Sequence, residues 1–131
     1  MSTILSFAAR LSAAVSGLLL AGAALAAAVP FNQAAFDKAV AAGEPVVVQF
    51  HADWCPTCRA QAPVVAEVLA EPRLKPLKFF VADFDSEREL KRTLKVTTQS
   101  TFVVFKAGKE VARSTGQTQR AAIEDILGRA L

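Results

Sequence analysis

The chain has two cysteines, Cys55 and Cys58, which lie close together in the stretch HADWCPTCRAQAP. Two thiols at this spacing can bond to each other or act jointly on a third group. Three interpretations follow: a redox couple, half of a metal site, or a structural disulfide. A disulfide that closes so short a loop constrains the unfolded chain very little, so a purely structural role is disfavoured.

A metal site needs more ligands than the two cysteines supply. Structural zinc sites use four ligands, and the neighbouring candidates are His51 and Asp53. A strand sends these two side chains to the same face without directing them at the cysteines. The sequence has no second cysteine pair. We therefore expect no metal within one chain, and a two-cysteine metal-binding module, possibly at a dimer interface, remains an alternative.

The elements around the cysteines favour thiol–disulfide exchange. The run VVVQF predicts a buried strand, and CPTCRAQAPVVAEVLAEP predicts a helix with Pro56 in its first turn and a kink at Pro63. A helix N-terminus stabilises an anion, so the thiolate of Cys55 should form readily. We expect an exposed attacking thiolate at Cys55 and a shielded resolving thiol at Cys58. No organic cofactor is needed, because the Cys55–Cys58 disulfide itself carries two electrons.

The rest of the chain predicts a single α/β domain. The expected order is helix, strand, helix, strand, helix, strand, strand, helix. The supporting stretches are FNQAAFDKAVAAGEP, VVVQF, CPTCRAQAPVVAEVLAEP, LKFFVADFD, SERELKRTL, TFVVFK, EVARST and the final helix containing Ile123 and Ile126. Ser86 with Glu89 forms a capping-box pattern that predicts a helix start. This order implies a central mixed β-sheet flanked by helices on both faces.

The N-terminal residues resemble an export signal. Arg10 is the only charged residue before Asp37, and it is followed by a long apolar run of small residues. This pattern predicts a signal peptide over residues 1–28, cleaved near Ala26 or Ala28, and a mature domain over 29–131 that is periplasmic or secreted. The alternative is a membrane anchor, because the uncleaved run is close to the length that spans a bilayer.

The charge pattern gives no sign of nucleic-acid binding. The chain has 15 Lys and Arg against 12 Asp and Glu, for a formal net charge of +3. The two signs alternate along the sequence, as in DSERELKRTLK, so they form no basic patch. We expect no nucleic-acid partner and a monomeric domain.

The stretch VVVQFHADWCPTCRAQAP resembles the active-site region of thioredoxin-fold proteins. The resemblance continues through VADFDSE and STFVVFKAGKEVARSTG and covers residues 31–131. It implies a thioredoxin fold in which Cys55 is the nucleophile and Cys58 the resolving cysteine. It also implies that Trp54 is the aromatic residue beside the active site, that Pro63 kinks the helix, and that the substrates are protein thiols and disulfides.

The sequence departs from the family where a cis-proline usually faces the cysteines. That position is Ser100, in TTQSTFVVF. The family uses this loop to pair with the substrate backbone and to exclude metals, so the resemblance places Gln99, Ser100 and Thr101 at the substrate. A cis bond before serine costs about 3 kcal/mol, so we expect a trans peptide or a strained loop.

Two further departures from the family concern proton transfer at the cysteines and the direction of electron flow. Gln49 replaces the family's buried aspartate and cannot act as a base, and His51 is a possible modulator of the thiolate or a sheet residue. Pro56 and Thr57 separate the cysteines, and with Trp54 they are expected to contact the substrate. Proline removes one N–H, and the Thr57 hydroxyl can donate to sulfur. The pair Pro-Thr resembles exported reductants. We expect a reductase recharged by a membrane electron-transfer partner, with a disulfide-donating oxidant as the alternative.

Overall fold

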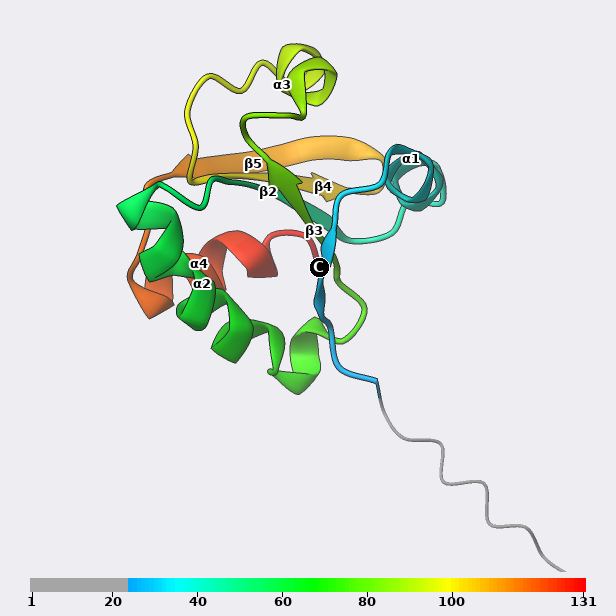
Figure 1. Ribbon diagram of the computed structural model, residues 1–131. Helices are drawn as coiled ribbons and strands as arrows, with labels where there is room; N and C mark the ends of the chain where they lie inside the picture. Colours follow the sequence, from blue (N-terminus) through cyan, green and yellow to red (C-terminus); the bar gives the residue numbers. More distant parts are fainter. Residues whose placement is uncertain (1–23) are drawn as a thin grey trace, which may run out of the picture.

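The apolar strand β2 (Val46–His51) lies at the centre of a five-stranded sheet in the computed structural model, which describes residues 24–131. The strand order is β1-β3-β2-β4-β5 (Figure 1). β2 runs parallel to β3 and antiparallel to β4. The first three residues of β2 carry β-branched side chains and are fully buried, as expected of a strand covered on both faces.

The elements follow one another as β1, α1, β2, α2, a 3-10 turn, β3, α3, β4, β5 and α4. Their bounds, besides that of β2, are β1 Ala28–Pro30, α1 Gln33–Ala41, α2 Pro56–Leu69, the turn Pro72–Leu74, β3 Lys78–Asp83, α3 Arg88–Leu94, β4 Thr101–Lys106, β5 Lys109–Thr115 and α4 Arg120–Gly128. Within residues 24–131, no helix is both long enough and apolar enough to cross a membrane.

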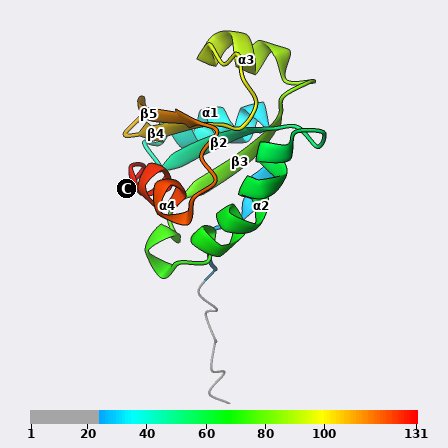
Figure 2. The same ribbon diagram turned by 90° about the vertical axis from the view of Figure 1, so that its left-hand side faces the viewer.

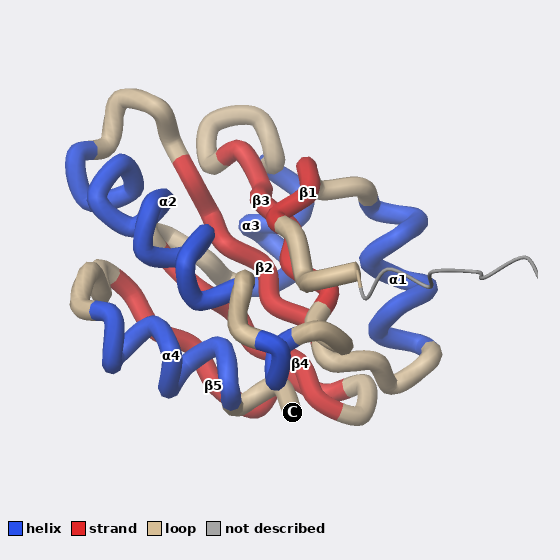
Figure 3. Tube along the Cα trace, turned by 90° about the horizontal axis from the view of Figure 1, so that it is seen from below, coloured by secondary structure: helices blue, strands red, loops and turns tan. Residues whose placement is uncertain are grey.

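Helices cover both faces of the sheet, as the element order predicts. α2 and α4 lie on one face, and α1 and α3 lie on the other (Figures 1 and 2). Figure 3 shows α2 and α4 side by side across their face. Successive side chains of β2 point to opposite faces of the sheet, so the strand contributes to two separate core clusters. Val47 packs in the cluster under α2 and α4, and Val48 and Phe50 pack in the cluster under α1 and α3.

Strand β1 is an element that the sequence analysis missed. It pairs in parallel with β3, with Ala28 opposite Phe79 and Pro30 opposite Val81. A strand of three residues, here Ala, Val and Pro, is too short to show the alternation of apolar and polar side chains by which a strand is recognised. β1 spans the boundary between the predicted signal peptide and the mature domain. Most of the predicted signal peptide, residues 1–23, lies outside the described residues.

The start of α3 differs from the predicted capping box. Glu87, not Ser86, is the N-cap residue, and no side chain caps the helix directly. Instead, Asp83 at the end of β3 accepts hydrogen bonds from the backbone N–H groups of Asp85 and Ser86 and from the Ser86 hydroxyl. These bonds hold the pKa of the Asp83 carboxyl below its ordinary value. A strand-end carboxylate therefore shapes this loop.

Candidate active site

Cys55 is the N-cap residue of α2. Its Sγ accepts a hydrogen bond from the backbone N–H of Cys58 at 3.2 Å, as capping side chains do. Pro56 occupies the first helical turn, where its missing N–H breaks no helical hydrogen bond. Strand β2 ends at His51, so a short turn delivers Cys55 to the positive end of the helix dipole.

Both cysteines are free thiols and both are buried, Cys55 at 2% exposure and Cys58 at 0%. The expected contrast between an exposed and a shielded sulfur is therefore wrong. The two cysteines pack with Ala52 in a small cluster, and Phe84, which follows β3, packs against it. Solvent exposure therefore does not distinguish the two sulfurs.

The Ser100 hydroxyl contacts both sulfurs. Its oxygen lies 3.2 Å from Cys55 Sγ and 3.1 Å from Cys58 Sγ, and Ser100 itself is buried. A hydroxyl carries one proton and can rotate to donate to either neighbour. The loop before β4 thus brings a hydrogen-bond donor within reach of both reacting atoms.

These contacts shift the two thiol pKa values in opposite directions. Burial acts to raise the pKa of Cys55, but the hydrogen bonds from the Cys58 thiol, the Ser100 hydroxyl and the N–H groups of Cys58 and Thr57 outweigh it and lower the pKa. Burial, followed by the hydrogen bond to Cys55, raises the pKa of the Cys58 thiol. The thiolate therefore forms more readily on Cys55 than on Cys58.

Ser100 adopts a left-handed backbone conformation with a φ of 62°, and no peptide bond within residues 24–131 is cis. A left-handed conformation costs a non-glycine residue roughly 1–2 kcal/mol. Its N–H donates to Phe50 at 2.8 Å, and its carbonyl accepts from the N–H of Gly116 at 3.0 Å. A trans peptide in a strained loop thus stands where the resemblance places a cis-proline.

Gln61 is a site residue that the sequence analysis missed. It is fully buried on α2, and its Nε2 donates to the carbonyls of Ser100 at 3.2 Å and Gln117 at 2.8 Å. Its Oε1 accepts from Gln49 Nε2 on β2 at 3.1 Å. The position three residues after Cys58, on the same helix face, is the signal that could have identified Gln61.

Gln49 and His51 line a cavity of about 310 Å³ between β1, β2 and α2. The Nε2 atom of His51 lies 3.0 Å from Asp53 Oδ1, so the imidazole is hydrogen-bonded to the turn that follows β2. Gln49 is directed at Gln61. In the part of the chain that the structure describes, no three His, Cys, Asp or Glu side chains gather to form a metal site.

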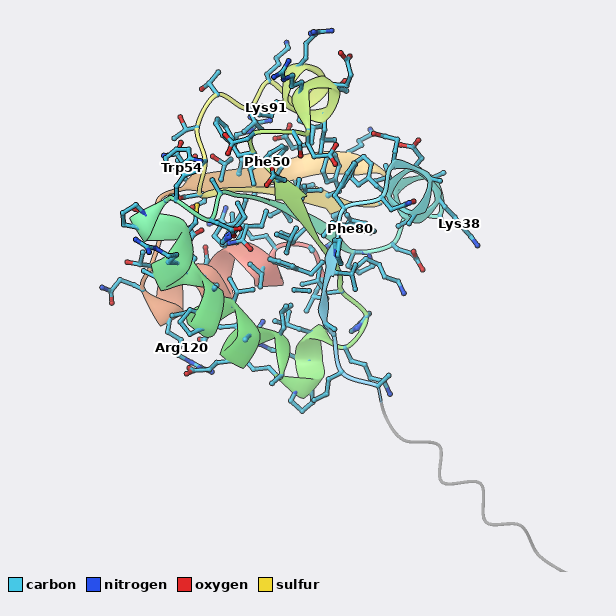
Figure 4. The ribbon with its side chains drawn as sticks, viewed as in Figure 1. Lys38, Phe50, Trp54, Phe80, Lys91 and Arg120 are labelled. Carbon is cyan, nitrogen blue, oxygen red and sulfur yellow. The ribbon has the colours of Figure 1, made fainter. Side chains whose placement is uncertain are left out.

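Trp54 is an exposed aromatic residue of the site, with 57% of its surface accessible. Its indole N–H donates to Asp85 in the loop after β3 at 2.8 Å. Figure 4 shows Trp54 at the end of the molecule where α2 begins. The Nζ atom of Lys91 lies 3.9 Å from the ring centroid of Phe84, which covers the cysteine cluster.

The remaining predicted site residues lie around the same loops. Pro56 is exposed and Gln99 is half-buried. Thr57 supports Cys55 through its backbone N–H, while the side-chain hydroxyl that contacts the sulfurs is that of Ser100. The Thr101 hydroxyl donates to the Thr98 carbonyl at 2.7 Å and also contacts the Thr115 hydroxyl, so it is engaged within the loop.

A cysteine pair at the start of a helix, directly after the central strand of a mixed sheet, defines a dithiol–disulfide exchange site. The thioredoxin family's sequence model matches residues 27–129. This chain therefore belongs to the thioredoxin family and has the thioredoxin fold. It is a thioredoxin-like protein-disulfide oxidoreductase with the motif Cys55-Pro-Thr-Cys58.

Individual relatives agree with this assignment. Thioredoxin-1 of Saccharomyces cerevisiae is 34% identical over 95 residues, covering 72% of this chain and 90% of the relative. The bifunctional thioredoxin reductase/thioredoxin of Mycobacterium leprae is 33% identical over 88 residues, which are 67% of this chain and only 19% of that protein. The crystal structure of Trxlp from Edwardsiella tarda has a TM-score of 0.75 at 37% identity, covering 77% of this chain and 98% of that one.

Proposed function

We propose that this chain is an exported, monomeric thioredoxin that reduces protein disulfides and is recharged by an electron-transfer partner in the membrane. The observation that carries the reaction is the pair of sulfurs at the N-terminus of α2, with Cys55 as its N-cap and Ser100 in contact with both. Cys55 attacks a partner disulfide, and Cys58 then displaces the partner from Cys55. Trp54 presents an exposed ring beside the sulfurs for the partner to contact.

Export is supported by the sequence before the domain. Arg10, the apolar run after it and the small residues at Ala24 and Ala26 form a signal-peptide pattern. The family match begins at residue 27 and β1 at Ala28, which supports a mature domain that begins near the end of this pattern. Disulfides persist outside the cytosol, so an exported dithiol needs a supply of electrons to stay reduced, and we assign that supply to a membrane partner.

Two features support the reductive direction, and one opposes it. The Pro-Thr dipeptide resembles exported reductants, and the described chain is one sheet with its helices and no inserted domain to hold an unfolded client. The hydrogen bonds to Cys55 oppose this direction, because stabilising the reduced form makes a couple more oxidising. The proposal therefore requires the reduction potential of the Cys55–Cys58 couple to remain low despite these hydrogen bonds.

The test is the redox state of Cys55 and Cys58 in the producing cell. Acid quenching followed by alkylation with a mass-adding reagent separates dithiol from disulfide, and cell fractionation locates the protein. We expect an exported protein held mainly as the dithiol, which turns into the disulfide when its membrane donor is removed. A disulfide at steady state identifies an oxidant instead, and a cytoplasmic protein contradicts export.

A further inference from the structure

The Ser100 hydroxyl is placed to take part in the reaction. Its oxygen lies at almost the same distance from the two sulfurs, 3.2 Å from Cys55 Sγ and 3.1 Å from Cys58 Sγ. All three groups are at least nine-tenths buried, so water does not compete freely for these contacts. A buried hydrogen bond to a charged group is stronger than one between neutral groups, so a single donor here has a large effect on a thiolate.

The backbone around Ser100 is built to hold the hydroxyl in this place. The left-handed φ of 62° is a conformation that serine adopts at a cost. The strain is offset by three hydrogen bonds, from the Ser100 N–H to Phe50 and to its carbonyl from Gly116 and Gln61. Residues with a strained backbone persist only where several surrounding contacts hold them, and they are concentrated at functional sites.

We propose that Ser100 is a catalytic residue whose single hydroxyl proton serves the two sulfurs in succession, first Cys55 and then Cys58. This inference rests on the proposed exchange activity. It adds the Ser100 hydroxyl to the two thiols as a third group that takes part in the reaction. It differs from the loop's expected role in pairing with the substrate backbone, because the side chain here touches the sulfurs themselves.

In the first step the hydroxyl donates to the Cys55 thiolate. Cys55 Sγ attacks one sulfur of the partner disulfide, a new S–S bond forms, and the partner's own S–S bond breaks. The second partner sulfur leaves with the electron pair and takes up a proton from water. Cys55 Sγ is now neutral and bonded to the partner, so it no longer holds the Ser100 proton strongly.

In the second step the hydroxyl turns about its C–O bond toward Cys58 Sγ. Cys58 loses its proton to water, and the hydroxyl stabilises the resulting thiolate, whose pKa burial otherwise raises. Cys58 attacks Cys55 Sγ, the intramolecular disulfide forms, and the first partner sulfur leaves with its electron pair and is protonated. The partner disulfide has gained two electrons and two protons. The protein has supplied both electrons and, through water, the Cys58 proton, and the second proton is the one that Cys55 released to water when its thiolate formed.

Other titratable groups on the surrounding elements have partners of their own. His51 on β2 contacts Asp53 in the turn, and Asp85 after β3 accepts from Trp54. Lys91 of α3 lies over the Phe84 ring. Because none of these contacts involves Ser100, we attribute a change in the thiol titration upon its substitution to the hydroxyl.

The experiment measures both steps in one reaction, using the full chain as purified from the producing cell and reduced. Reaction with the aromatic disulfide 5,5′-dithiobis(2-nitrobenzoate) releases one thionitrobenzoate on attack by Cys55 and a second on resolution by Cys58. Two phases in the unaltered protein establish exchange itself, independently of Ser100. The rate of each phase is then followed against pH in Ser100→Ala and Ser100→Gly.

The two variants separate the hydroxyl from the backbone. Both remove the hydroxyl, and glycine also adopts the left-handed conformation without strain, so Ser100→Gly tests the idea even if Ser100→Ala folds poorly. Thr115→Val is the matched control, because it removes a hydroxyl that reaches the same loop through Thr101 and not the sulfurs.

We expect the pH midpoint of the first phase to rise by about one pH unit in both Ser100 variants and to stay in place in Thr115→Val. Below the midpoint each phase slows about threefold, because a tenfold loss of thiolate is partly offset by its greater intrinsic nucleophilicity. Above the midpoint the variants attack faster than the unaltered protein. Unchanged midpoints in both Ser100 variants, or an equal rise in Thr115→Val, would overturn the proposal. A change in the first phase alone would overturn the successive use of the proton.

Discussion

Gln49 and Gln61 are joined by a buried side-chain hydrogen bond in which Gln49 Nε2 donates to Gln61 Oε1 at 3.1 Å. Gln61 in turn donates to the carbonyls of Ser100 and Gln117. The central strand is thereby tied, through two amides, to the loop that contacts both sulfurs. A glutamine amide does not take up a proton at neutral pH, so this chain of bonds fixes geometry where the family resemblance places an aspartate.

Replacing Gln61 with leucine should destabilise the protein. The change leaves the buried Gln49 Nε2 without its acceptor, and an unsatisfied buried polar group costs about 1–3 kcal/mol. Urea unfolding of the reduced protein measures the loss. Gln33→Leu is the control, because Gln33 is an exposed residue bonded to Asp37, and we expect it to stay within about 0.5 kcal/mol of the unaltered protein. Equal losses in both variants would show that the buried amide pair has no special role.

The indole of Trp54 should depend on Asp85 for its position at the active-site surface. Asp85→Ala removes the acceptor of the 2.8 Å bond and leaves an exposed ring free to move. We expect reduction of a protein disulfide, such as that of insulin, to slow several-fold, while reaction with a small aromatic disulfide is unchanged, because only a protein partner needs the fixed ring. Equal slowing toward both substrates would indicate damage to the thiols instead of to the contact surface.

The sequence was sufficient for the elements whose patterns are strong. The apolar strand β2 lies where its periodicity predicts it, and α2 begins with Pro56 in its first turn as predicted. The two thiols at the start of α2 were also predictable, since the spacing and the strand-to-helix order are local features.

The features that could not be predicted are long-range. Gln61 meets Ser100 across 39 residues of sequence, and this contact leaves no local pattern. The family resemblance did place Ser100 opposite the cysteines, but it gave no sign that the hydroxyl would contact both sulfurs. The burial of Cys55 has the same origin, because loops distant in sequence cover it. β1 was missed because three residues at a sheet edge carry no periodicity.

The reduction potential should depend on pH with a break at the lowered pKa of Cys55. Below that pKa, reduction takes up two protons and the potential falls by about 59 mV per pH unit. Between it and the raised pKa of Cys58 only one proton is taken up, and the slope falls to about 30 mV. Redox titration at several pH values measures both slopes. A single steep slope up to pH 9.0, the ordinary thiol value, would contradict the lowered pKa.

Cleavage of the predicted signal peptide should leave strand β1 intact. Cleavage after Ala26 follows the small residues at Ala24 and Ala26 and retains Ala28, which pairs with Phe79. We therefore expect the intact mass of the exported protein to correspond to residues 27–131. A mass that begins at Val29 would show that the first residue of β1 is dispensable, and an unprocessed mass would favour the membrane anchor.

The most direct test of an exported reductase is the potential of the Cys55–Cys58 couple. The protein is equilibrated at pH 7 in graded thiol and disulfide buffers, its free thiols are trapped by alkylation, and the fraction reduced is fitted to a two-electron couple. We predict a potential near the reducing end of this fold, about −270 mV. A value near the oxidising end, about −120 mV, would contradict the reductase and identify a disulfide donor.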